Sequence, residues 1–251
     1  MTPLIDGDML LYECCFSLEY QRKNDTEWTF PEFDDVHTAA TNKITEICNV
    51  VEAVEKPIIV FTDTRWLADL QNRSYVPVFR YDVAKTKPYK AGRKKDKPFY
   101  FNSLMVTLMA EYPYLVSSDG YEADDELGIL QCKDDEQPTI ICSRDKDLRQ
   151  IPGWHFSWET KINPSFGPAK ASGIGRLWKN DKDKVFGLGW KWFFYQMLVG
   201  DSVDNIAGCK GVGPVAAYAE LEDCTSLRQM YDIVYTLYNK VYKKEAYYIF
   251  H

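Results

Sequence analysis

Apolar residues in roughly the first 160 positions follow two alternating patterns. One pattern is a short, continuous apolar run, found at residues 2–5, 57–61, 114–116 and 138–142. Such runs, bounded by proline or by polar residues, are typical of buried strands in a parallel sheet. The other pattern is an apolar repeat with a period near 3.6 residues, which predicts helices at residues 9–16, 36–54, 98–112 and 124–131. Together they predict an α/β fold, with a mostly parallel central sheet covered by helices on both faces.

The rest of the chain has a different pattern. Residues 154–158 alternate weakly and predict an edge strand, whereas residues 161–184 are rich in Gly, Lys, Asn and Pro and predict a loop or linker. Helical patterns return at residues 189–199, 215–221 and 223–248, and Pro214 suits the first turn of a helix. Earlier in the chain, Asp34 or Asp35 is expected to cap the second helix.

Composition indicates a soluble globular chain. Of its 251 residues, 45% are hydrophobic and 27% are charged, and the formal net charge is −7. The seven cysteines lack zinc-binding spacing, which together with their odd number indicates reduced thiols in a cytosol. The sequence contains neither a charged-then-apolar leader nor an apolar run long enough for a bilayer, so we expect a cytoplasmic protein without membrane contact.

Carboxylates follow the predicted strands at the points where the strands end or the next helices start. These acids are Asp6, Asp63, Glu122, Asp124, Asp125, Asp145 and Asp147. Because the carboxyl ends of parallel strands lie at one edge of a sheet, we expect the acids to converge there. On a helix, Glu122 and Asp125 share a face and Asp124 points partly away. Taken alone, this cluster is better explained as a solvated first turn whose acids offset the helix dipole.

Acids that face inward at such spacing repel one another unless a cation neutralises them. Asp201 and Asp204, just after the helix at residues 189–199, are spaced to approach the same site. Oxygen ligands without a matching histidine favour Mg²⁺ or Mn²⁺ over zinc. Two such ions held by carboxylates serve phosphodiester hydrolysis. The sequence shows neither a Ser/His/Asp or Cys/His nucleophile set nor a Walker-type loop.

A dense basic segment interrupts this acidic chain. Against the single acid Asp96 it carries Lys85, Lys87, Lys90, Arg93, Lys94, Lys95 and Lys97. Aromatic residues, among them Tyr89 and Phe99, lie within or beside it. Basic residues with aromatic neighbours can follow a phosphate backbone and stack on bases. A flexible, solvated loop is the alternative.

A second candidate for nucleic-acid binding is the glycine-rich turn between the helices at residues 189–199 and 215–221. It contains Gly208, Lys210, Gly211 and Gly213. Backbone amides at the start of the second helix can hold a phosphate, so the two helices would form a non-specific clamp. The alternative is a tight helical hairpin that uses glycine only to turn.

Six short motifs carry a resemblance to a known family. In chain order they are Leu4-Ile5-Asp6-Gly7-Asp8, Phe61-Thr62-Asp63, Tyr89-Lys90-x-x-Arg93, Glu122-Ala123-Asp124-Asp125, Ser143-Arg144-Asp145-Lys146-Asp147 and Gly200-Asp201-x-x-Asp204-Asn205. This order resembles the structure-specific 5′-nuclease family, which includes flap endonucleases and the 5′-nuclease domain of bacterial DNA polymerase I. The likeness is greatest to the 5′-to-3′ exonucleases of tailed bacteriophages, and it spans residues 3–220.

The resemblance implies a PIN-like catalytic core at residues 1–160, with a basic arch at residues 85–97. It also implies a helical region at residues 185–251, with a helix–three-turn–helix DNA clamp at residues 190–221. Members of the family can bind K⁺ at this hairpin, although Ala207 stands where the family often has Pro.

The resemblance also assigns roles to residues. The metal ligands would be Asp6, Asp63, Glu122, Asp124, Asp125, Asp145, Asp147, Asp201 and Asp204. Lys90 and Arg93 would contact the scissile phosphate, and Tyr89 would stack on a terminal base. The remaining contacts to DNA would come from Lys85, Lys87, Lys94, Lys95, Gly208, Lys210, Gly211 and Gly213.

The implied reaction is hydrolysis of phosphodiesters from 5′ to 3′ with two Mg²⁺ ions, for which Mn²⁺ can substitute. The products carry 5′-phosphates, and the substrates are double-stranded, nicked or flapped DNA, with RNA–DNA hybrids as a further class. Such an enzyme would serve bacteriophage DNA replication, recombination or removal of RNA primers in the cytoplasm of a bacterial host.

Three alternatives remain open. Asp6-Gly7-Asp8 after an apolar strand also resembles a haloacid-dehalogenase-type phosphatase, which would leave the cluster at residues 122–125 and the basic segment without a role. A DNA-binding protein without catalysis would have no use for acids that repel DNA. A PIN-type ribonuclease would not need the clamp.

Overall fold

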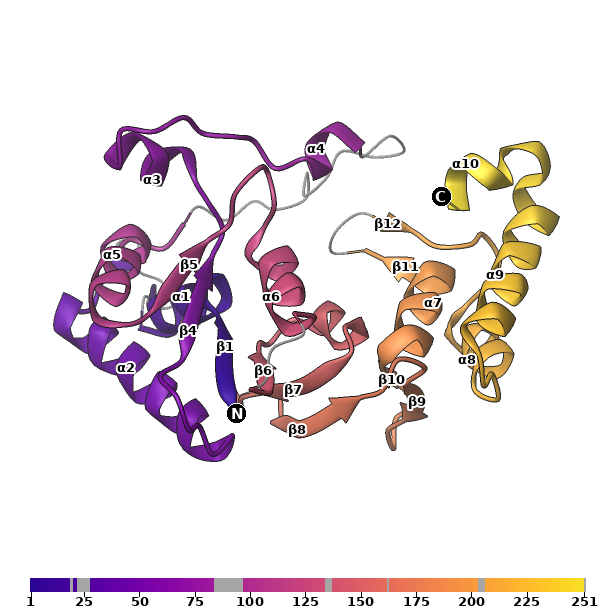
Figure 1. Cartoon of the computed structure of the whole chain (residues 1–251), viewed down its shortest axis with the longest axis horizontal. Coiled ribbons are helices and arrows are strands. Elements are labelled where there is room, and N and C mark those ends of the chain that lie inside the picture. The colour runs from indigo at the N-terminus through magenta and orange to yellow at the C-terminus, as the bar shows by residue number, and fades with distance from the viewer. Residues whose placement is uncertain are drawn as a thin grey trace. The chain divides into compact units, whose positions relative to one another are not determined.

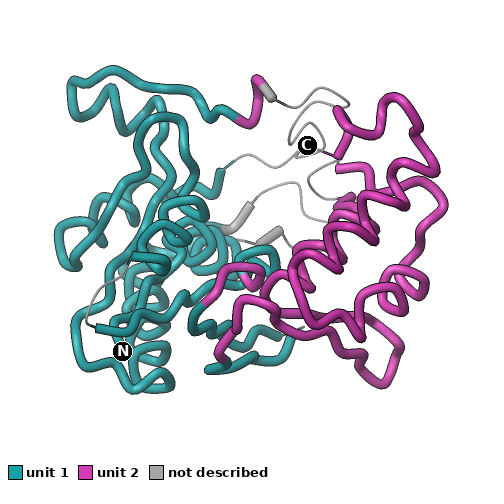
Figure 2. Tube along the Cα trace, turned by 45° about the vertical axis from the view of Figure 1, so that its right-hand side comes forward, with its two compact units in different colours: residues 1–79, 94–148, 153–169 teal, residues 80–93, 149–152, 170–251 magenta. Residues whose placement is uncertain are grey.

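The structure is a computed structural model that describes residues 1–18, 20–21, 28–83, 97–133, 137–161, 163–202 and 206–250. The chain forms two compact units, shown in teal and magenta in Figure 2. Unit 1 comprises residues 1–79, 94–148 and 153–169, and unit 2 comprises residues 80–93, 149–152 and 170–251. Each unit has its own hydrophobic core.

Unit 1 is built on a six-stranded sheet with the order β5-β4-β1-β6-β7-β8 (Figure 1). The strands are β1 (Thr2–Asp6), β4 (Ile58–Phe61), β5 (Tyr114–Val116), β6 (Thr139–Cys142), β7 (Gly153–Ser157) and β8 (Phe166–Ala171). Every neighbouring pair from β5 to β7 is parallel. The α/β fold with a mostly parallel sheet is therefore confirmed. A short antiparallel pair, β2 (Tyr20–Gln21) and β3 (Trp28–Thr29), is separate from this sheet.

Helices cover both faces of the sheet. They are α1 (Gly7–Leu18), α2 (Phe33–Val50), α3 (Arg65–Leu70), α5 (Phe101–Glu111) and α6 (Ala123–Gln131), with a short 3₁₀ helix, η1 (Asp147–Gln150). Ile5 and Ile59 belong to the cluster formed with α1, α2 and α5, whereas their neighbours Leu4 and Val60 are buried outside that cluster. Successive strand residues point to opposite faces, and α6 packs against β1, β4 and β6, so α6 covers the second face.

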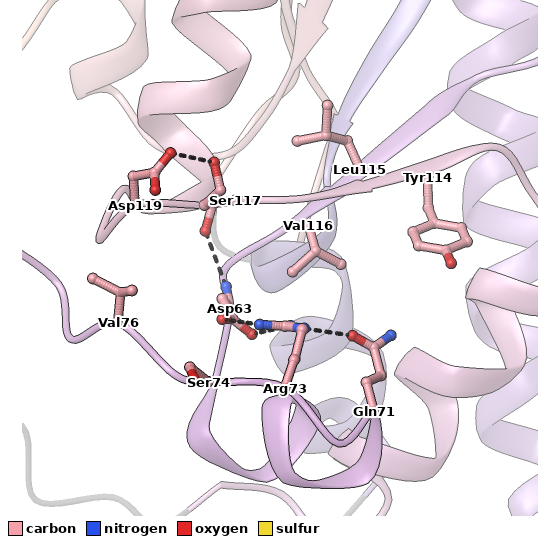
Figure 3. Close-up of a pocket in the computed structure, with 11 residues that line it drawn as sticks. Asp63, Gln71, Arg73, Ser74, Val76, Tyr114, Leu115, Val116, Ser117 and Asp119 are labelled. Carbon is pink, nitrogen blue, oxygen red and sulfur yellow. Dashed lines mark hydrogen bonds and ion pairs between the residues drawn. The ribbon is translucent and has the colours of Figure 1, made fainter.

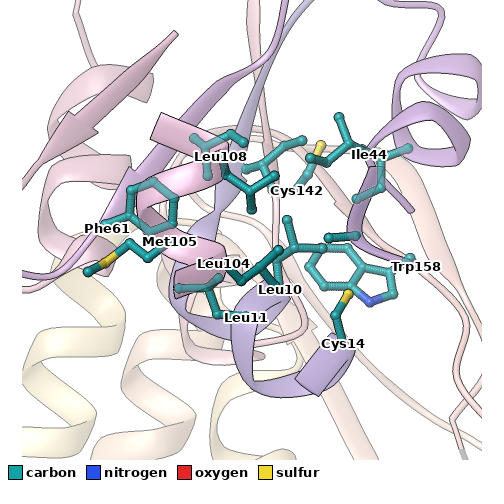
Figure 4. Close-up of a cluster of buried hydrophobic side chains, with 14 of the residues drawn as sticks. Leu10, Leu11, Cys14, Ile44, Phe61, Leu104, Met105, Leu108, Cys142 and Trp158 are labelled. Atoms are coloured by element: carbon teal, nitrogen blue, oxygen red, sulfur yellow. The ribbon is translucent and has the colours of Figure 1, made fainter. Parts of the chain in front are cut away.

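The core of unit 1 explains why these helices dock where they do. Figure 4 shows apolar side chains of α1, α2 and α5 meeting Phe61 of β4 and Trp158. The helical contributors include Leu10, Leu11, Cys14, Ile44, Leu104, Met105 and Leu108. Fully burying one such aliphatic side chain contributes about 2 kcal/mol. Burial also raises the pKa of the Cys14 thiol to about 12, so that this thiol stays protonated.

The structure differs from three local predictions. The N-cap of α2 is Glu32, and Asp34 and Asp35 lie in the first helical turn. β7 pairs with β6 and β8 and is therefore an interior strand, not an edge strand. Residues 161–184 were predicted to form a loop, but they contain β8 and β9 (Arg176–Lys179). Glycine and proline within Phe-Gly-Pro-Ala-Lys-Ala removed the usual strand signal from β8.

Unit 2 is mainly helical. It contains α4 (Arg80–Val83), the antiparallel pair β9 and β10 (Val185–Leu188), α7 (Gly189–Val199), the pair β11 (Gly200–Asp201) and β12 (Ile206–Ala207), α8 (Pro214–Leu221), α9 (Leu227–Tyr242), η2 (Lys243–Glu245) and α10 (Ala246–Phe250). Pro214 begins α8 as predicted. The helix expected over residues 223–248 is divided at Lys243, whose φ is 52°. Within the described residues, no helix is long and apolar enough to cross a membrane.

Candidate active site at the carboxyl edge of the sheet

The parallel strands of unit 1 place their carboxyl ends at one edge of the sheet. Asp6 is the last residue of β1, and Asp63 follows β4 by two positions. Asp145 follows β6, and Glu122 is the N-cap of α6, the helix that comes after β5. The connection between strand ends and acids that the sequence predicts is therefore present in the fold.

Asp6 is the buried centre of this edge, with 5% of its surface exposed. One carboxylate oxygen accepts a hydrogen bond from the Met9 N–H (3.0 Å), which helps start α1, and the other accepts one from the Ser143 hydroxyl (2.6 Å). Burial and the nearby charge of Asp8, with a smaller effect of Asp124, raise the pKa of Asp6 to about 8 despite these two donors. Near neutral pH and without a bound cation, Asp6 is therefore mainly protonated.

Hydroxyl groups connect the strand ends to one another. The Thr62 N–H after β4 donates to Asp8 of α1 (3.2 Å), and the Thr62 hydroxyl accepts from the Ala123 N–H at the start of α6 (2.8 Å). The Asp63 N–H donates to the hydroxyl of Ser117 (3.0 Å), which follows β5. The sequence patterns did not point to these hydroxyl residues. Thr62 and Ser117 each come directly after a predicted strand, and this position could have indicated that they lie at the site.

At α6, the acidic cluster has a structural role as well as a place in the site. Glu122 is buried, with 7% of its surface exposed, and its backbone N–H donates to the Asp125 carboxylate (2.9 Å). The acids of this first turn also offset the helix dipole. The dipole part of the alternative explanation, a solvated first turn, therefore applies as well. Asp124, expected to point partly away, is close enough to Asp6 for its charge to raise the pKa of Asp6.

The acids after β6 are organised by local hydrogen bonds. The Ser143 hydroxyl that donates to Asp6 also accepts from the Asp145 N–H (2.9 Å). Asp145 in turn accepts from the Asp147 N–H (2.8 Å), and Asp147 forms an ion pair with the exposed Lys146 (2.7 Å). Ser143 therefore links Asp6 to the turn that carries Asp145 and Asp147.

Asp63 is in a different electrostatic environment from Asp6. Its carboxylate receives two hydrogen bonds of 2.6 Å from the guanidinium of Arg73, whose third donor binds Gln71 (2.8 Å). This pair lines a cavity of about 430 Å³. Figure 3 shows the pair together with Ser117 and Asp119, which also line the cavity. A bidentate pair of this kind neutralises the carboxylate. A metal ion at Asp63 would have to compete with Arg73.

The described part of the chain contains no group of three or more acidic, histidine or cysteine side chains arranged closely enough to hold a metal ion. Asp6, Asp8 and Asp124 are close enough for the charges of Asp8 and Asp124 to raise the pKa of Asp6, and carboxylate oxygens are the ligands that Mg²⁺ prefers. Asp201 belongs to β11 in unit 2. Asp204, Lys85, Lys87, Tyr89, Lys90, Arg93, Lys94 and Lys95 lie outside the described residues. The complete ligand set therefore stays a prediction.

The glycine-rich turn of unit 2 is described except for residues 203–205. β11 pairs with β12, and the Cys209 N–H donates to the carbonyl of Leu198 in α7 (2.8 Å). Gly200 has a φ of 73°, and a side chain there would meet Gly208 N at 2.3 Å. Side chains at Gly211 and Gly213 would meet nothing within 4 Å, so the backbone at these two positions is open to a ligand.

The fold and the acidic edge define a mostly parallel α/β protein with its candidate site at the carboxyl ends of the strands. No family model matches the sequence. The chain is 25% identical to DNA polymerase I of Caldicellulosiruptor bescii over 248 residues, which cover 91% of this chain and 25% of the polymerase. It is 24% identical to the exodeoxyribonuclease of Enterobacteria phage T3 over 225 residues, 85% of this chain and 64% of the phage protein.

A third relative, the 5′-3′ exonuclease of Mycoplasma genitalium, is 25% identical over 249 residues, which cover 95% of this chain and 76% of the exonuclease. The resemblance to the 5′-nuclease family is confirmed by these relatives. The names of the two exonuclease relatives, exodeoxyribonuclease and 5′-3′ exonuclease, agree with the 5′-3′ exonuclease class predicted from the motifs. The chain spans only a quarter of the Caldicellulosiruptor polymerase.

Solved structures share the fold. A phage T5 protein co-crystallised with metal ions aligns with a TM-score of 0.58 at 13% identity, covering 99% of this chain and 86% of its own. The T5 flap endonuclease in a pseudo-enzyme-product complex with DNA and metal ions aligns with a TM-score of 0.53 at 12% identity, covering 99% and 91%. At these identities the likeness shows the fold alone, which agrees with the predicted fold class.

Proposed function

We propose that this chain is a divalent-metal-dependent 5′-to-3′ DNA exonuclease that also cuts flapped DNA and leaves 5′-phosphates. The observation that carries the proposal is the charge at the sheet edge. Asp6 is buried beside Asp8 and Asp124, and its pKa is raised to about 8. A cation bound beside these carboxylates would lower the pKa of Asp6 and favour its ionised form. The exonuclease relatives agree with this assignment.

In this proposal the nine predicted acids hold two Mg²⁺ ions, with Mn²⁺ as a substitute. Bound ions of this kind lower the pKa of an attacking water and stabilise the charge that develops on the phosphate oxygens. The protein's own contribution is orientation. Ser143 and the Met9 N–H fix both oxygens of Asp6, and Thr62 fixes the approach of α6 to β4. These contacts hold the carboxylates in place before substrate arrives.

Lys90 and Arg93 are proposed to contact the scissile phosphate, where a cation stabilises charge that grows in the transition state. Tyr89 is proposed to stack on a terminal base, and the neighbouring lysines to follow the phosphate backbone. The support is the density of basic residues at positions 85–97 in a chain whose net charge is −7.

The helix–turn–helix of α7, the glycine-rich turn and α8 is proposed to clamp the duplex part of the substrate. The open backbone at Gly211 and Gly213, next to the exposed Lys210, supports a contact to phosphate rather than to bases. Such a clamp recognises shape and charge, so nicked DNA, flapped DNA and RNA–DNA hybrids are proposed as substrates.

The test uses duplexes labelled at the 5′ or the 3′ end, incubated with Mg²⁺ or with EDTA. Blunt, nicked, flapped and single-stranded substrates are compared. We expect short 5′-labelled products in Mg²⁺ only, with flapped or nicked DNA cut fastest. Activity that survives EDTA, or shortening from the 3′ end, would overturn the proposal. Hydrolysis of p-nitrophenyl phosphate without DNA cleavage would instead favour the phosphatase alternative.

A further inference from the structure

Helix α9 holds the backbone of the glycine-rich turn in unit 2. Tyr238 and Tyr242 are four residues apart and therefore lie on one face of α9. The Tyr238 hydroxyl donates to the carbonyl of Met197 in the last turn of α7 (2.6 Å). The Tyr242 hydroxyl donates to the carbonyl of Gly208 (3.3 Å) and accepts from the N–H of Lys210 (3.1 Å). One helix thus contacts both sides of the turn.

The Tyr242 hydroxyl spans the peptide segment that precedes α8. Gly208 and Lys210 flank Cys209, whose own N–H is bound to the carbonyl of Leu198 (2.8 Å). Three consecutive residues are therefore fixed by α7 and α9 together. The Tyr242 ring packs against Tyr238 with 5.6 Å between ring centroids, which restrains the hydroxyl. A loop that is held in one conformation loses less conformational entropy when it binds a ligand.

A cavity of about 400 Å³ adjoins this segment. Lys210, Gly211, Lys240 and the acid Glu220 contribute to its lining, and the rest of the lining is apolar and comes from Val212, Ala216, Leu237 and Val241. Lys240 belongs to α9 and is exposed, as is Lys210. Two lysines from separate elements next to an open glycine backbone match the charge and the shape of a phosphodiester.

The structure assigns Tyr242 as a positioning residue for DNA binding, and α9 as a third element of the clamp. The Tyr242 hydroxyl holds the Lys210 backbone, and Lys240 adds a second cation to the same cavity, which receives a phosphate of the DNA backbone. This inference rests on the proposed function and deepens it, because it gives α9 a role in recognising the substrate.

The decisive variant is Tyr242→Phe, which removes one hydroxyl and keeps the ring. Tyr248→Phe is the matched control, since 83% of Tyr248 is exposed. Binding of nicked duplex DNA is measured in EDTA by fluorescence anisotropy at several salt concentrations. We expect Tyr242→Phe to weaken binding about three- to tenfold, the loss typical of a hydrogen bond in a preorganised site. The salt slope should stay unchanged, because no charge is removed. In Mg²⁺, KM should rise while kcat stays constant.

A double-mutant comparison separates positioning from general destabilisation. Lys210→Ala should lower the salt slope by about 0.9, as expected for one lost phosphate contact. If Tyr242 acts through Lys210, Tyr242→Phe should weaken binding far less in the Lys210→Ala background. Hydrogen exchange at the Lys210 amide, which loses its acceptor in Tyr242→Phe, should become faster. The assignment would be overturned if Tyr242→Phe bound DNA as tightly as the wild type. It would also be overturned if the double variant lost affinity by the full product of the two single losses.

Lys240→Ala tests the second half of the assignment without touching the core, because Lys240 is exposed. It should also lower the salt slope by about 0.9, whereas Lys244→Ala, a nearby exposed lysine of η2, should not. An unchanged slope in Lys240→Ala would contradict a phosphate contact there. Failure of the wild type to bind or cut DNA would instead refute the proposed function itself, so the two failures are distinguishable.

Discussion

Asp6 is the last residue of β1, and Asp63 follows the adjacent parallel strand β4. The two carboxylates nevertheless have opposite electrostatic environments. Arg73 neutralises Asp63 through two hydrogen bonds of 2.6 Å. Asp6 is bound to Ser143 and the Met9 N–H, but burial and the charges of Asp8 and Asp124 outweigh those donors and raise its pKa to about 8. The unfavourable electrostatic energy of the edge is therefore concentrated at Asp6.

This electrostatic energy should appear in the pH dependence of stability. A carboxyl whose folded pKa lies above its unfolded value of 3.8 stabilises the fold fully at low pH, and the stabilisation is lost as pH rises toward 8. In EDTA, we expect the free energy of unfolding to fall by up to about 1.4 kcal/mol per pH unit between roughly pH 4 and pH 8. Asp6→Asn should flatten this dependence, as measured by urea unfolding at each pH.

The control for that measurement is Asp119→Asn, which removes an exposed carboxylate from a residue with a φ of 53° that asparagine tolerates. Asp119→Asn should keep the pH dependence of the wild type. Parallel pH profiles for Asp6→Asn and the wild type would show that Asp6 does not carry the unfavourable charge. Mg²⁺ should raise the stability of the wild type more at pH 8 than at pH 5, because a larger fraction of Asp6 is ionised at pH 8.

Arg73 should compete with a metal ion for Asp63. Arg73→Gln removes the cation and keeps a polar side chain, so it should strengthen Mn²⁺ binding about two- to fivefold, the range expected from a partly exposed ion pair. Calorimetric titration of the DNA-free protein measures this affinity. Arg65→Gln, which removes a neighbouring positive charge that lies over Tyr75, is the matched control. Equal Mn²⁺ affinity in the two variants would show that Arg73 does not compete.

At the scale of elements, the β11–β12 hairpin depends on glycine at its close backbone contact. Gly200→Ala would place a methyl group 2.3 Å from Gly208 N at a φ of 73°, so we expect a loss of about 2–4 kcal/mol from strain and repacking. Gly213→Ala meets nothing within 4 Å and should change stability by less than about 1 kcal/mol. Urea unfolding of both variants measures the difference. Similar losses would indicate that the close contact is unimportant.

Strands and helices with clear apolar patterns could be predicted, and elements stabilised mainly by their neighbours could not. The runs that became β1, β4 and β6 were evident because parallel strands are buried on both faces. β8 was missed because Gly167 and Pro168 suppress its strand signal. Its strand conformation is stabilised by pairing with β7, which the local sequence does not reveal. β7 was predicted as a strand, but its polar residues His155 and Ser157 gave it the weak alternation of an edge strand, although both are buried.

At the scale of the whole molecule, the sequence placed acids at strand ends but did not reveal what each acid contacts. The parallel pairing of β1, β4 and β6 follows from short-range patterns, so the position of Asp6 could be predicted. The pairing of Asp63 with Arg73 and the bridging by Ser143 arise from side-chain geometry in the folded state. No spacing in the sequence encodes them, because both depend on how loops fold back over the sheet edge.

The place of β1 in the sheet has a consequence for synthesis of the protein. β1 is translated before the other strands of its sheet, yet it is a central strand whose partners arrive later, as the pairing of Leu4 with both Ile58 and Ile141 shows. Asp6 meets Ser143 across a separation of 137 residues. A ribosome must therefore release β6 before the acidic edge can assemble. A nascent chain shorter than this lacks the contact between Asp6 and Ser143, so the proposed nuclease activity can begin only once most of unit 1 has left the exit tunnel.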